Sequence, residues 1–246
     1  MLRSQFLPTR GSEPELLSIL FIENFTIALI ALGAGYAILK SSGEPLKKIS
    51  SNQWRQFLLT VLLNTLVTYS GFSLWANGFI KISVDINWGI AVHFVVLFIA
   101  MDLLLYALHY LMHSGFLFKN LHYKHHTGQK LRPIDFFIIH PLEAIVYGAL
   151  WLAFLALFTF NLYAIIFYLV VHVLFGVMSH LGMEGAPAKG LISEYLVDSH
   201  YHQLHHKSPQ HNLGFYTSIW DKLFGTNAGP DTEKAILFSS LNTEKQ

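Results

Sequence analysis

The chain has 246 residues, of which 53% are hydrophobic and only 13% charged, whereas soluble domains carry about 25% charged residues. This composition predicts a lipid-embedded protein, and the length allows one domain with several spans but no fused reductase or haem module. A net charge of +1 gives no support to a nucleic-acid partner, and the lack of cysteine excludes disulfides, iron–sulfur clusters and thiolate metal sites.

Three apolar stretches in the first half of the chain are long enough to cross a bilayer, which takes about 20 residues. They are Leu16–Leu39 (interrupted by Glu23 and Asn24), Phe57–Phe79, and Trp88 to about Leu111. The start of the chain has no apolar core directly behind its positive charges, so we expect no cleaved signal peptide. The N-terminal region therefore predicts membrane spans and carries no motif of its own.

A further apolar region runs from Glu143 to Val177, and Asn161 breaks it near its middle. It suits a helical hairpin of two short spans, or one span and one re-entrant helix. Four of its side chains could line a dry slot for a lipid chain, although packing or lipid contact is the simpler interpretation for any one of them. They are Tyr147, Trp151, Phe154 and Phe158.

Lysine and arginine are unevenly distributed over the polar segments. Loop 40–56 and segment 114–133 carry four each and the region after Ser179 carries five, but loop 80–87 carries only Lys81. The positive-inside rule then places the N-terminus outside, and segment 114–133 and the C-terminal region in the cytoplasm. Arg3 and Arg10 conflict with this orientation, because it puts them outside.

Ten of the fourteen histidines lie in two short tracts, 109–126 and 200–211. Neutral imidazole is a strong ligand for iron, zinc and copper. His109 and His113 are four residues apart, so on a helix they share one face and can converge on one metal. The same face continues back through Tyr106 and Asp102. Because an aspartate inside a span is costly, we expect Asp102 to accept the second ring N–H of a ligating histidine and fix its tautomer.

The pattern HxxHH occurs twice, at 122–126 and at 202–206. Adjacent histidines on a helix point about 100° apart, so His125 and His126 can serve different metals, while His122 shares the side of His125. The second copy, His202 with His205 and His206, repeats this geometry. One copy alone is compatible with a solvated turn. Two copies flanking a membrane hairpin, together with the helical pair, predict a site for two metal ions.

The remaining histidines allow more than one interpretation. His140 and His180 lie where spans meet the cytoplasmic face, and either could complete a metal site or support a ligand. His200 and His211 flank the second cluster, and each could be either a ligand or a solvated neighbour. His93 and His172 lie within apolar spans, which favours core or substrate-pocket positions.

These motifs, in this order, resemble the fatty acid hydroxylase/sterol desaturase superfamily of integral-membrane di-iron oxygenases. The resemblance covers about half the chain, from Asp102 to Thr226. It is carried by DLLLYALHYLMH at 102–113, LHYKHH at 121–126, HPLE at 140–143, the isolated His180 followed by Gly182, HQLHH at 202–206, and the ending NLGFYTSIWDKLFGT at 212–226.

The resemblance implies a site for two iron ions, with zinc as an alternative occupant, and dioxygen as co-substrate. The ligands it implies are His109, His113, His122, His125, His126, His202, His205 and His206, with His180 as a ninth and Asp102, Tyr106 and His140 as supporting residues. The expected reaction hydroxylates or desaturates a C–H bond of a sterol, fatty acyl or related lipid. Electrons are expected from a separate donor, cytochrome b5 or a ferredoxin with an NAD(P)H reductase.

The predicted fold is therefore all-α, a multi-span transmembrane helical bundle with a cytoplasmic histidine-lined di-metal cap. We expect N-terminal spans over 1–87, a catalytic region over 88–229 and a tail over 230–246. The protein is expected in the bacterial inner membrane, or in the endoplasmic reticulum membrane if it is eukaryotic.

Two other functions fit parts of the pattern. A histidine-ligated zinc hydrolase needs a carboxylate base, and Tyr110 occupies the place where zinc proteases have glutamate, which leaves Glu184 as the candidate. A metal transporter places its ligands near the bilayer midplane, whereas these clusters lie at the ends of spans. The sequence leaves open the lipid, the donor, and the choice among hydroxylation, desaturation and ether cleavage.

Overall fold

A computed structural model describes residues 13–127, 131–183 and 194–243, without the side chains of 239–243. This part of the chain is nearly all helical, which confirms the predicted all-α class. The elements in chain order are α2 (Glu13–Ser41), α3 (Ser51–Ala76), β1 (Lys81–Ser83), α4 (Gly89–Met112), α5 (Gly115–Leu117), a π-helix η1 (Phe118–His122), 3₁₀ helices η2 (His125–Thr127) and η3 (Pro133–Phe137), α6 (Pro141–Leu157), β2 (Thr159–Asn161), α7 (Leu162–Ser179), α8 (Ser199–Lys207), α9 (Ile219–Phe224) and α10 (Pro230–Thr243).

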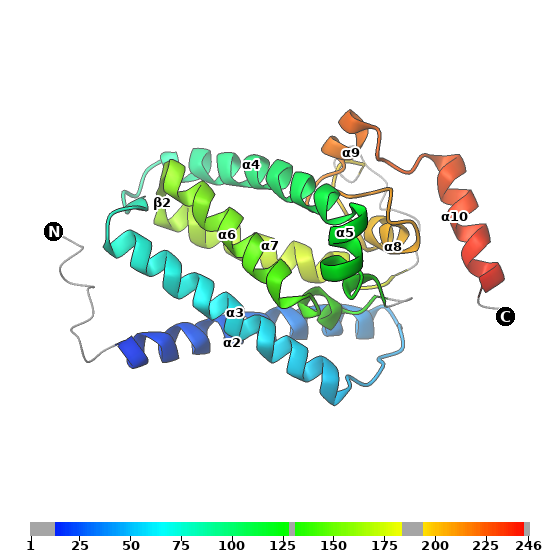
Figure 1. The fold of residues 1–246 in the computed structure, drawn as a ribbon, viewed down its shortest axis with the longest axis horizontal. Helices are drawn as coiled ribbons and strands as arrows, with labels where there is room; N and C mark the ends of the chain where they lie inside the picture. Colours follow the sequence, from blue (N-terminus) through cyan, green and yellow to red (C-terminus); the bar gives the residue numbers. More distant parts are fainter. Residues whose placement is uncertain (1–12, 128–130, 184–193, 244–246) are drawn as a thin grey trace.

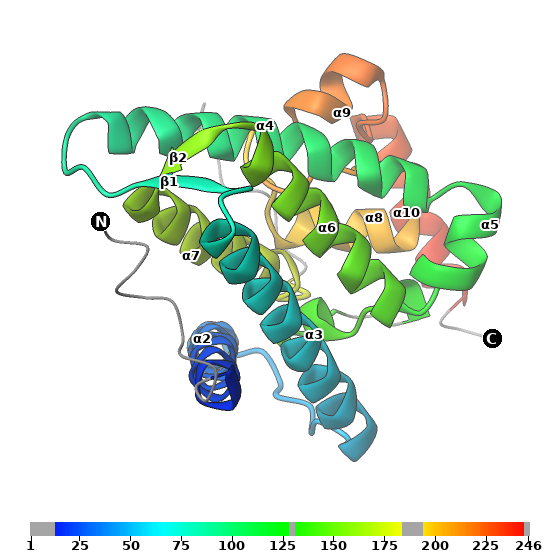
Figure 2. The same ribbon diagram turned by 60° about the vertical axis from the view of Figure 1, so that its left-hand side comes forward.

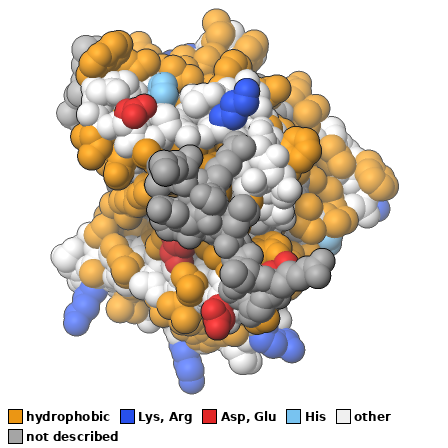
Figure 3. Space-filling view, turned by 90° about the vertical axis from the view of Figure 1, so that its left-hand side faces the viewer, with side chains coloured by type: hydrophobic (Ala, Val, Ile, Leu, Met, Phe, Trp, Pro, Cys, Tyr) orange, Lys and Arg blue, Asp and Glu red, His pale blue; other side chains and the backbone are white. Residues whose placement is uncertain are grey.

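Four of the described helices, α2, α3, α4 and α7, are long and apolar enough to cross a membrane, and α6 is shorter at 17 residues. Only 22–33% of the residues in their most apolar stretches are buried within the protein. Hydrophobic side chains accordingly cover much of the face in Figure 3. Because a helix satisfies its own backbone hydrogen bonds, such exposed apolar surfaces suit lipid contact, and the prediction of a multi-span bundle is confirmed.

The predicted hairpin is present as α6 and α7. Its break is the short strand β2, where Asn161 accepts a hydrogen bond from the Tyr163 backbone N–H and so caps α7. β2 pairs in parallel with β1, the strand that precedes α4. Figure 2 shows this two-stranded ribbon at the end of the bundle where α3 finishes. The polar residue in the apolar stretch thus marks a turn between two helices.

Close approach of the helices depends on small residues. A Cβ added to Gly148 of α6 would lie 2.4 Å from a methyl group of Val67 on α3, and one added to Gly176 of α7 would lie 2.2 Å from the Phe136 ring. Glycine therefore permits these contacts, as is common between membrane helices. One core cluster joins α4, α6 and α7, and a second joins α2 and α3 to η3.

The direction of the helices brings both histidine tracts to one end of the bundle. α4 and α7 finish there and α6 begins there, next to η1, η3 and α8. In Figure 1 this end lies on the right, near α5 and α8, and β2 lies on the left. The described part of the N-terminus starts at the end opposite the histidines, as the predicted alternation of spans requires.

Asp102 fastens the segment after α8 to α4. Its carboxylate accepts the backbone N–H groups of Tyr216 (2.9 Å) and Thr217 (3.2 Å), the Thr217 hydroxyl, and the indole N–H of Trp220 (3.0 Å). The expectation that Asp102 fixes the tautomer of a histidine is therefore wrong, because its bonding capacity is used by residues 216–220. The carboxylate stabilises a membrane helix against a distant loop.

Asp221 has a similar role inside that loop and is fully buried. Its carboxylate accepts the backbone N–H groups of Leu213 (2.8 Å) and Gly214 (2.6 Å) and the hydroxyls of Tyr201 and Thr226. We call residues 211–226 the closing segment. Asp102 attaches it to α4, and Asp221 ties its two halves together.

Replacing Asp102 by alanine should destabilise the protein. The buried donors of residues 216–220 would lose their acceptor, and each unsatisfied donor costs about 1–3 kcal/mol. We expect the apparent melting temperature in detergent to fall by on the order of 10 °C. Asp85→Ala, at an exposed aspartate near the opposite end, should leave it unchanged. A D102A protein that melts with the wild type would contradict this role.

Candidate metal centre

Nine histidines from four parts of the chain meet at one end of the bundle. They come from the end of α4, from η1 and η2, from the end of α7, and from α8. In each of two groups, the candidate ligand atoms all lie within 4.8 Å of one another. The five-histidine group is His109, His113, His122, His126 and His205, and the four-histidine group is His125, His180, His202 and His206. These are the nine histidines that the sequence analysis names as ligands.

Each HxxHH motif contributes to both groups. In the first copy, His122 and His126 belong to the five-histidine group and His125 to the four-histidine group. The second copy does the reverse, since its outer pair joins the four-histidine group and His205 joins the other. Neighbouring histidines thus lie in different groups, as expected. The expectation that His122 shares a side with His125 is wrong.

Helical spacing explains the pairing in the second copy, because His202 and His206 are four residues apart on α8 and share one face. Residues 118–122 form a π-helical turn in which the Tyr123 N–H donates to the Phe118 carbonyl at 2.7 Å, and η2 then begins at His125. The outer residues of the first copy, His122 and His126, also share a group, and they lie where this π turn leads into η2. π turns are rare in proteins, and those that occur are often found at functional sites.

Four of the nine rings donate from Nδ1 to an oxygen. The pairs are His109 with the Leu213 carbonyl (2.8 Å), His122 with Glu143 Oε1 (2.7 Å), His180 with the Gly176 carbonyl (2.7 Å) and His205 with the His211 carbonyl (2.7 Å). A carbonyl or carboxylate oxygen only accepts, so Nδ1 carries the proton and Nε2 presents its lone pair. The tautomers of these rings are set by their partners.

The lone pairs converge. The Nε2 atoms of His109 and His122 lie 3.1 Å apart although neither carries a proton, and a cation between them would offset the repulsion of their lone pairs. Two nitrogens bound at right angles, each at about 2.1 Å from a metal, lie about 3 Å apart. Further ring nitrogens are buried and have no hydrogen-bond partner among the described residues, namely Nε2 of His205, Nδ1 of His125 and His206, and both nitrogens of His126. The donor set therefore fits metal ions in both groups.

Burial also favours the neutral form of several of these rings. It lowers the pKa of His180 to about 4, and burial together with neighbouring histidines lowers the pKa values of His113 and His202 well below their usual range. A neutral imidazole is the form that binds a metal. At neutral pH the site is thus ready for cations without losing protons first.

Glu143 is a functional residue that the sequence analysis missed. It is 1% exposed and accepts the His122 Nδ1–H. Its position offered a signal, because a carboxylate opens an apolar helix within the HPLE motif. His140 of that motif caps α6 instead, where its Nδ1 accepts the Leu142 backbone N–H. A carboxylate that orients a ligating histidine is a common partner of metal sites.

The other supporting candidates act on the closing segment. The Tyr106 hydroxyl bonds that of Thr226 (2.9 Å), and its ring stacks on Phe224. Like Asp102, it therefore contacts the segment whose Leu213 and His211 carbonyls set two histidine tautomers. Asp102 and Tyr106 therefore act on the histidines indirectly, through the closing segment.

The two flanking histidines have contacts of their own. His211 contributes the carbonyl that His205 uses, and its ring bonds the Ser208 hydroxyl (3.0 Å). His200 Nε2 bonds Glu233 of α10 (2.8 Å) and so joins α8 to residues predicted as a tail. Glu184, the candidate base of a zinc hydrolase, lies outside the described residues.

The candidate slot residues differ in position. Trp151 stacks on Tyr168 of α7, Phe154 belongs to the core, and Tyr147 packs against that core. Phe158 is 56% exposed at the end of α6 away from the histidines. Core packing is thus the observed role of the first three.

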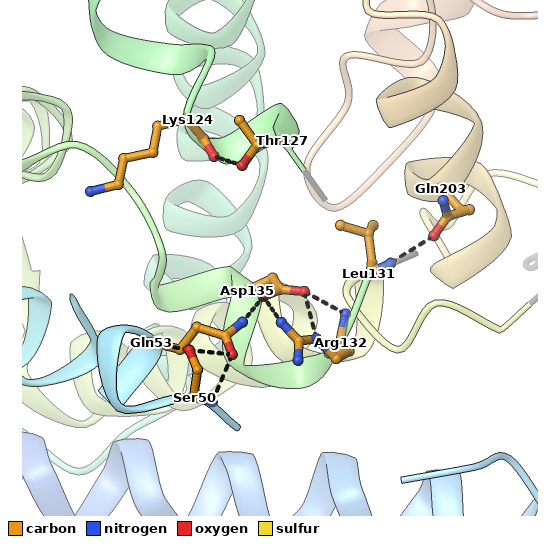
Figure 4. A network of polar contacts seen from close by, with 8 residues as sticks. All are labelled: Ser50, Gln53, Lys124, Thr127, Leu131, Arg132, Asp135 and Gln203. Atoms are coloured by element: carbon orange, nitrogen blue, oxygen red, sulfur yellow. Dashed lines mark hydrogen bonds and ion pairs between the residues drawn. The ribbon is translucent and has the colours of Figure 1, made fainter. Parts of the chain in front are cut away.

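A polar network supports α8 from the side of α3 (Figure 4). Gln203, between two ligand positions of α8, accepts the Leu131 N–H at 3.1 Å. The next residue, Arg132, pairs with Asp135 (3.2 Å), which also accepts from Gln53 of α3. The network links the histidine-bearing helix α8 to the N-terminal half of the bundle.

Comparison with known proteins agrees with this site. Residues 94–226, just over half the chain, match the fatty acid hydroxylase family, and the match includes all nine histidines. A Delta(7)-sterol 5(6)-desaturase of Eremothecium gossypii is 26% identical over 183 residues, which cover 72% of this chain and 46% of that protein.

Two further relatives are similar. A lathosterol oxidase of Rattus norvegicus is 26% identical over 67% of this chain and 56% of its own length. A putative methylsterol monooxygenase of Dictyostelium discoideum is 26% identical over 60% of this chain and 55% of its own length. The chain spans about half the length of these curated relatives, and no solved structure matches it. By the family match over residues 94–226, the chain belongs to the fatty acid hydroxylase family.

Proposed function

We propose that this protein is a membrane-bound di-iron oxygenase that hydroxylates or desaturates a lipid. The observation that carries the proposal is the convergence of nine buried or partly buried histidines in two groups at one end of a membrane bundle. A shell of neutral nitrogens suits iron, copper or zinc, and family membership favours iron.

Two iron ions bound to these groups would activate dioxygen, the chemistry that an alkyl C–H bond requires and that side chains alone do not supply. The protein's own contribution is orientation. Glu143 and the carbonyls of Leu213, Gly176 and His211 hold four rings with Nε2 directed inward. Each HxxHH motif contributes histidines to both groups. The helix α8 and the segment η1–η2 therefore each position candidate ligands of the five-histidine group and of the four-histidine group.

The overall reaction requires an external reductant. Hydroxylation consumes dioxygen, two electrons and two protons and yields the alcohol and water, and desaturation with the same inputs yields the alkene and two waters. We propose that cytochrome b5, or a ferredoxin with its reductase, supplies the electrons at the cytoplasmic face. The basic residues of segment 114–133 and of the C-terminal region support this orientation.

A sterol or sterol-like lipid is the substrate class that we favour. The relatives named above are described as enzymes acting on sterols. Positions of the histidines at helix ends, and not midway along the spans, give no support to a transport pathway.

Replacing one ligand should remove metal and activity together. We expect the purified wild type to contain about two irons per chain, coupled as a pair in Mössbauer spectra of iron-57-enriched protein. His122→Ala should lower the iron content and abolish lipid oxidation. His93→Gln, at a histidine that accepts the Asn161 N–H far from the site, should change neither. Full turnover in H122A, or zinc alone after anaerobic iron reconstitution of the wild type, would overturn the proposal.

Glu143→Gln tests the orienting carboxylate. Glutamine keeps the size of the side chain but loses the charge that strengthens the hydrogen bond from His122. We expect the concentration of a chelator that removes half the iron to fall by about 10- to 100-fold. Glu15→Gln, an exposed glutamate at the start of α2, is the matched control. Equal retention of iron in E143Q and wild type would show that Glu143 does not act on the metal site.

A further inference from the structure

His172 is a polar residue within α7 that belongs to neither histidine group. It lies on the bundle-facing side, because residues at four-residue spacing before and after it, Ala164, Tyr168, Gly176 and His180, are buried. His172 itself is only partly buried. Part of the His172 side chain is therefore accessible.

A hydrogen-bond chain sets the tautomer of His172. The Tyr168 and Tyr216 hydroxyls lie 2.7 Å apart, and the Tyr216 hydroxyl lies 2.6 Å from His172 Nδ1. Neither hydroxyl has another hydrogen-bond partner among the described residues. Both protons find an acceptor only if Tyr168 donates to Tyr216 and Tyr216 donates to His172 Nδ1. The proton of the neutral His172 ring is then on Nε2.

The Nε2–H of His172 has no acceptor within the described part of the chain. Its neighbours are aromatic, since the ring stacks on Phe215 at 5.2 Å and contacts Phe136 at 6.2 Å between centroids. A donor without an acceptor is unfavourable in a membrane-embedded site. An oxygen atom of a bound ligand would satisfy it.

This donor lies close to the metal centre. The Phe136 ring contacts both His172 and His180, the latter at 5.8 Å between centroids. His180 leans back over the preceding turn, because its Nδ1 donates to the Gly176 carbonyl. His172 and His180 are eight residues apart along α7, which is about two helical turns or ~12 Å along the helix axis.

We propose that His172 binds a hydroxyl oxygen of the lipid substrate and thereby selects a compact hydroxylated lipid, such as a 3-hydroxysterol. The inference rests on the proposed function and adds a specificity-determining residue to it. A separation of about two helical turns suits an oxygen in the same ring system as the oxidised carbon. The carboxyl group of a long acyl chain oxidised far from its head fits less well.

The test compares two sterols that differ only in the hydroxyl. Binding of cholestanol and of 5α-cholestane to the iron-loaded protein in nanodiscs is measured by competition with radiolabelled cholestanol. One hydrogen bond predicts that the wild type prefers cholestanol by about five- to tenfold. His172→Phe should reduce this preference to less than about twofold while cholestane binds as before, and His172→Gln, which keeps an N–H donor, should retain part of it.

Two controls separate recognition from disruption. His93→Gln should bind both sterols like the wild type, and the iron content of each variant reports an intact site. Tyr216→Phe should weaken the preference without removing it, because the His172 tautomer is no longer set. Equal binding of the two sterols to the wild type, binding of neither, or an unchanged preference in H172F would overturn the inference.

Failure of the inference and failure of the proposed function give different results. A protein that contains iron and oxidises a lipid, but whose sterol preference does not depend on His172, contradicts only the inference. A protein whose preference depends on His172 but which holds zinc and oxidises nothing contradicts the proposed function and leaves the recognition site in place.

Discussion

The structure depends on bringing neutral imidazoles together with their lone pairs facing one another. Such an arrangement is unfavourable without a cation, and burial prevents the rings from accepting protons to relieve it. The Nε2 atoms of His109 and His122, 3.1 Å apart, show the problem most clearly, because their Nδ1 protons are committed to Leu213 and Glu143. The elements around the nine rings hold them in an arrangement whose repulsion metal ions would offset.

Two buried carboxylates, Asp102 and Asp221, hold the closing segment in place. This segment sets the tautomers of two of the histidines. Asp102 reaches from a membrane helix to the closing segment, and Asp221 joins the ends of that segment to each other. The carbonyls of Leu213 and His211 then orient His109 and His205. The same segment carries Tyr216, which sets the tautomer of His172. Metal binding and the proposed recognition of a lipid hydroxyl thus share one support.

Because each HxxHH motif contributes to both groups, the two groups depend on the same two segments of the chain. Each motif places its outer pair in one group and its middle histidine in the other. A displacement of α8 or of η1–η2 therefore disturbs both groups at once. The polar network from Gln203 through Leu131 to Gln53 ties α8 to α3 and limits such displacement.

The sequence by itself determined the helical membrane class, the spans, the nine histidines and their likeness to one family, because these follow from apolar length and from local spacing. Only the tertiary structure decided which histidines share a group, because each group takes rings from elements far apart in the sequence, such as His109 of α4 and His205 of α8. It also reassigned Asp102 and brought Glu143 to the site. Those roles depend on contacts between residues 114 and 21 positions apart, and local pattern carries no information about partners at such separations.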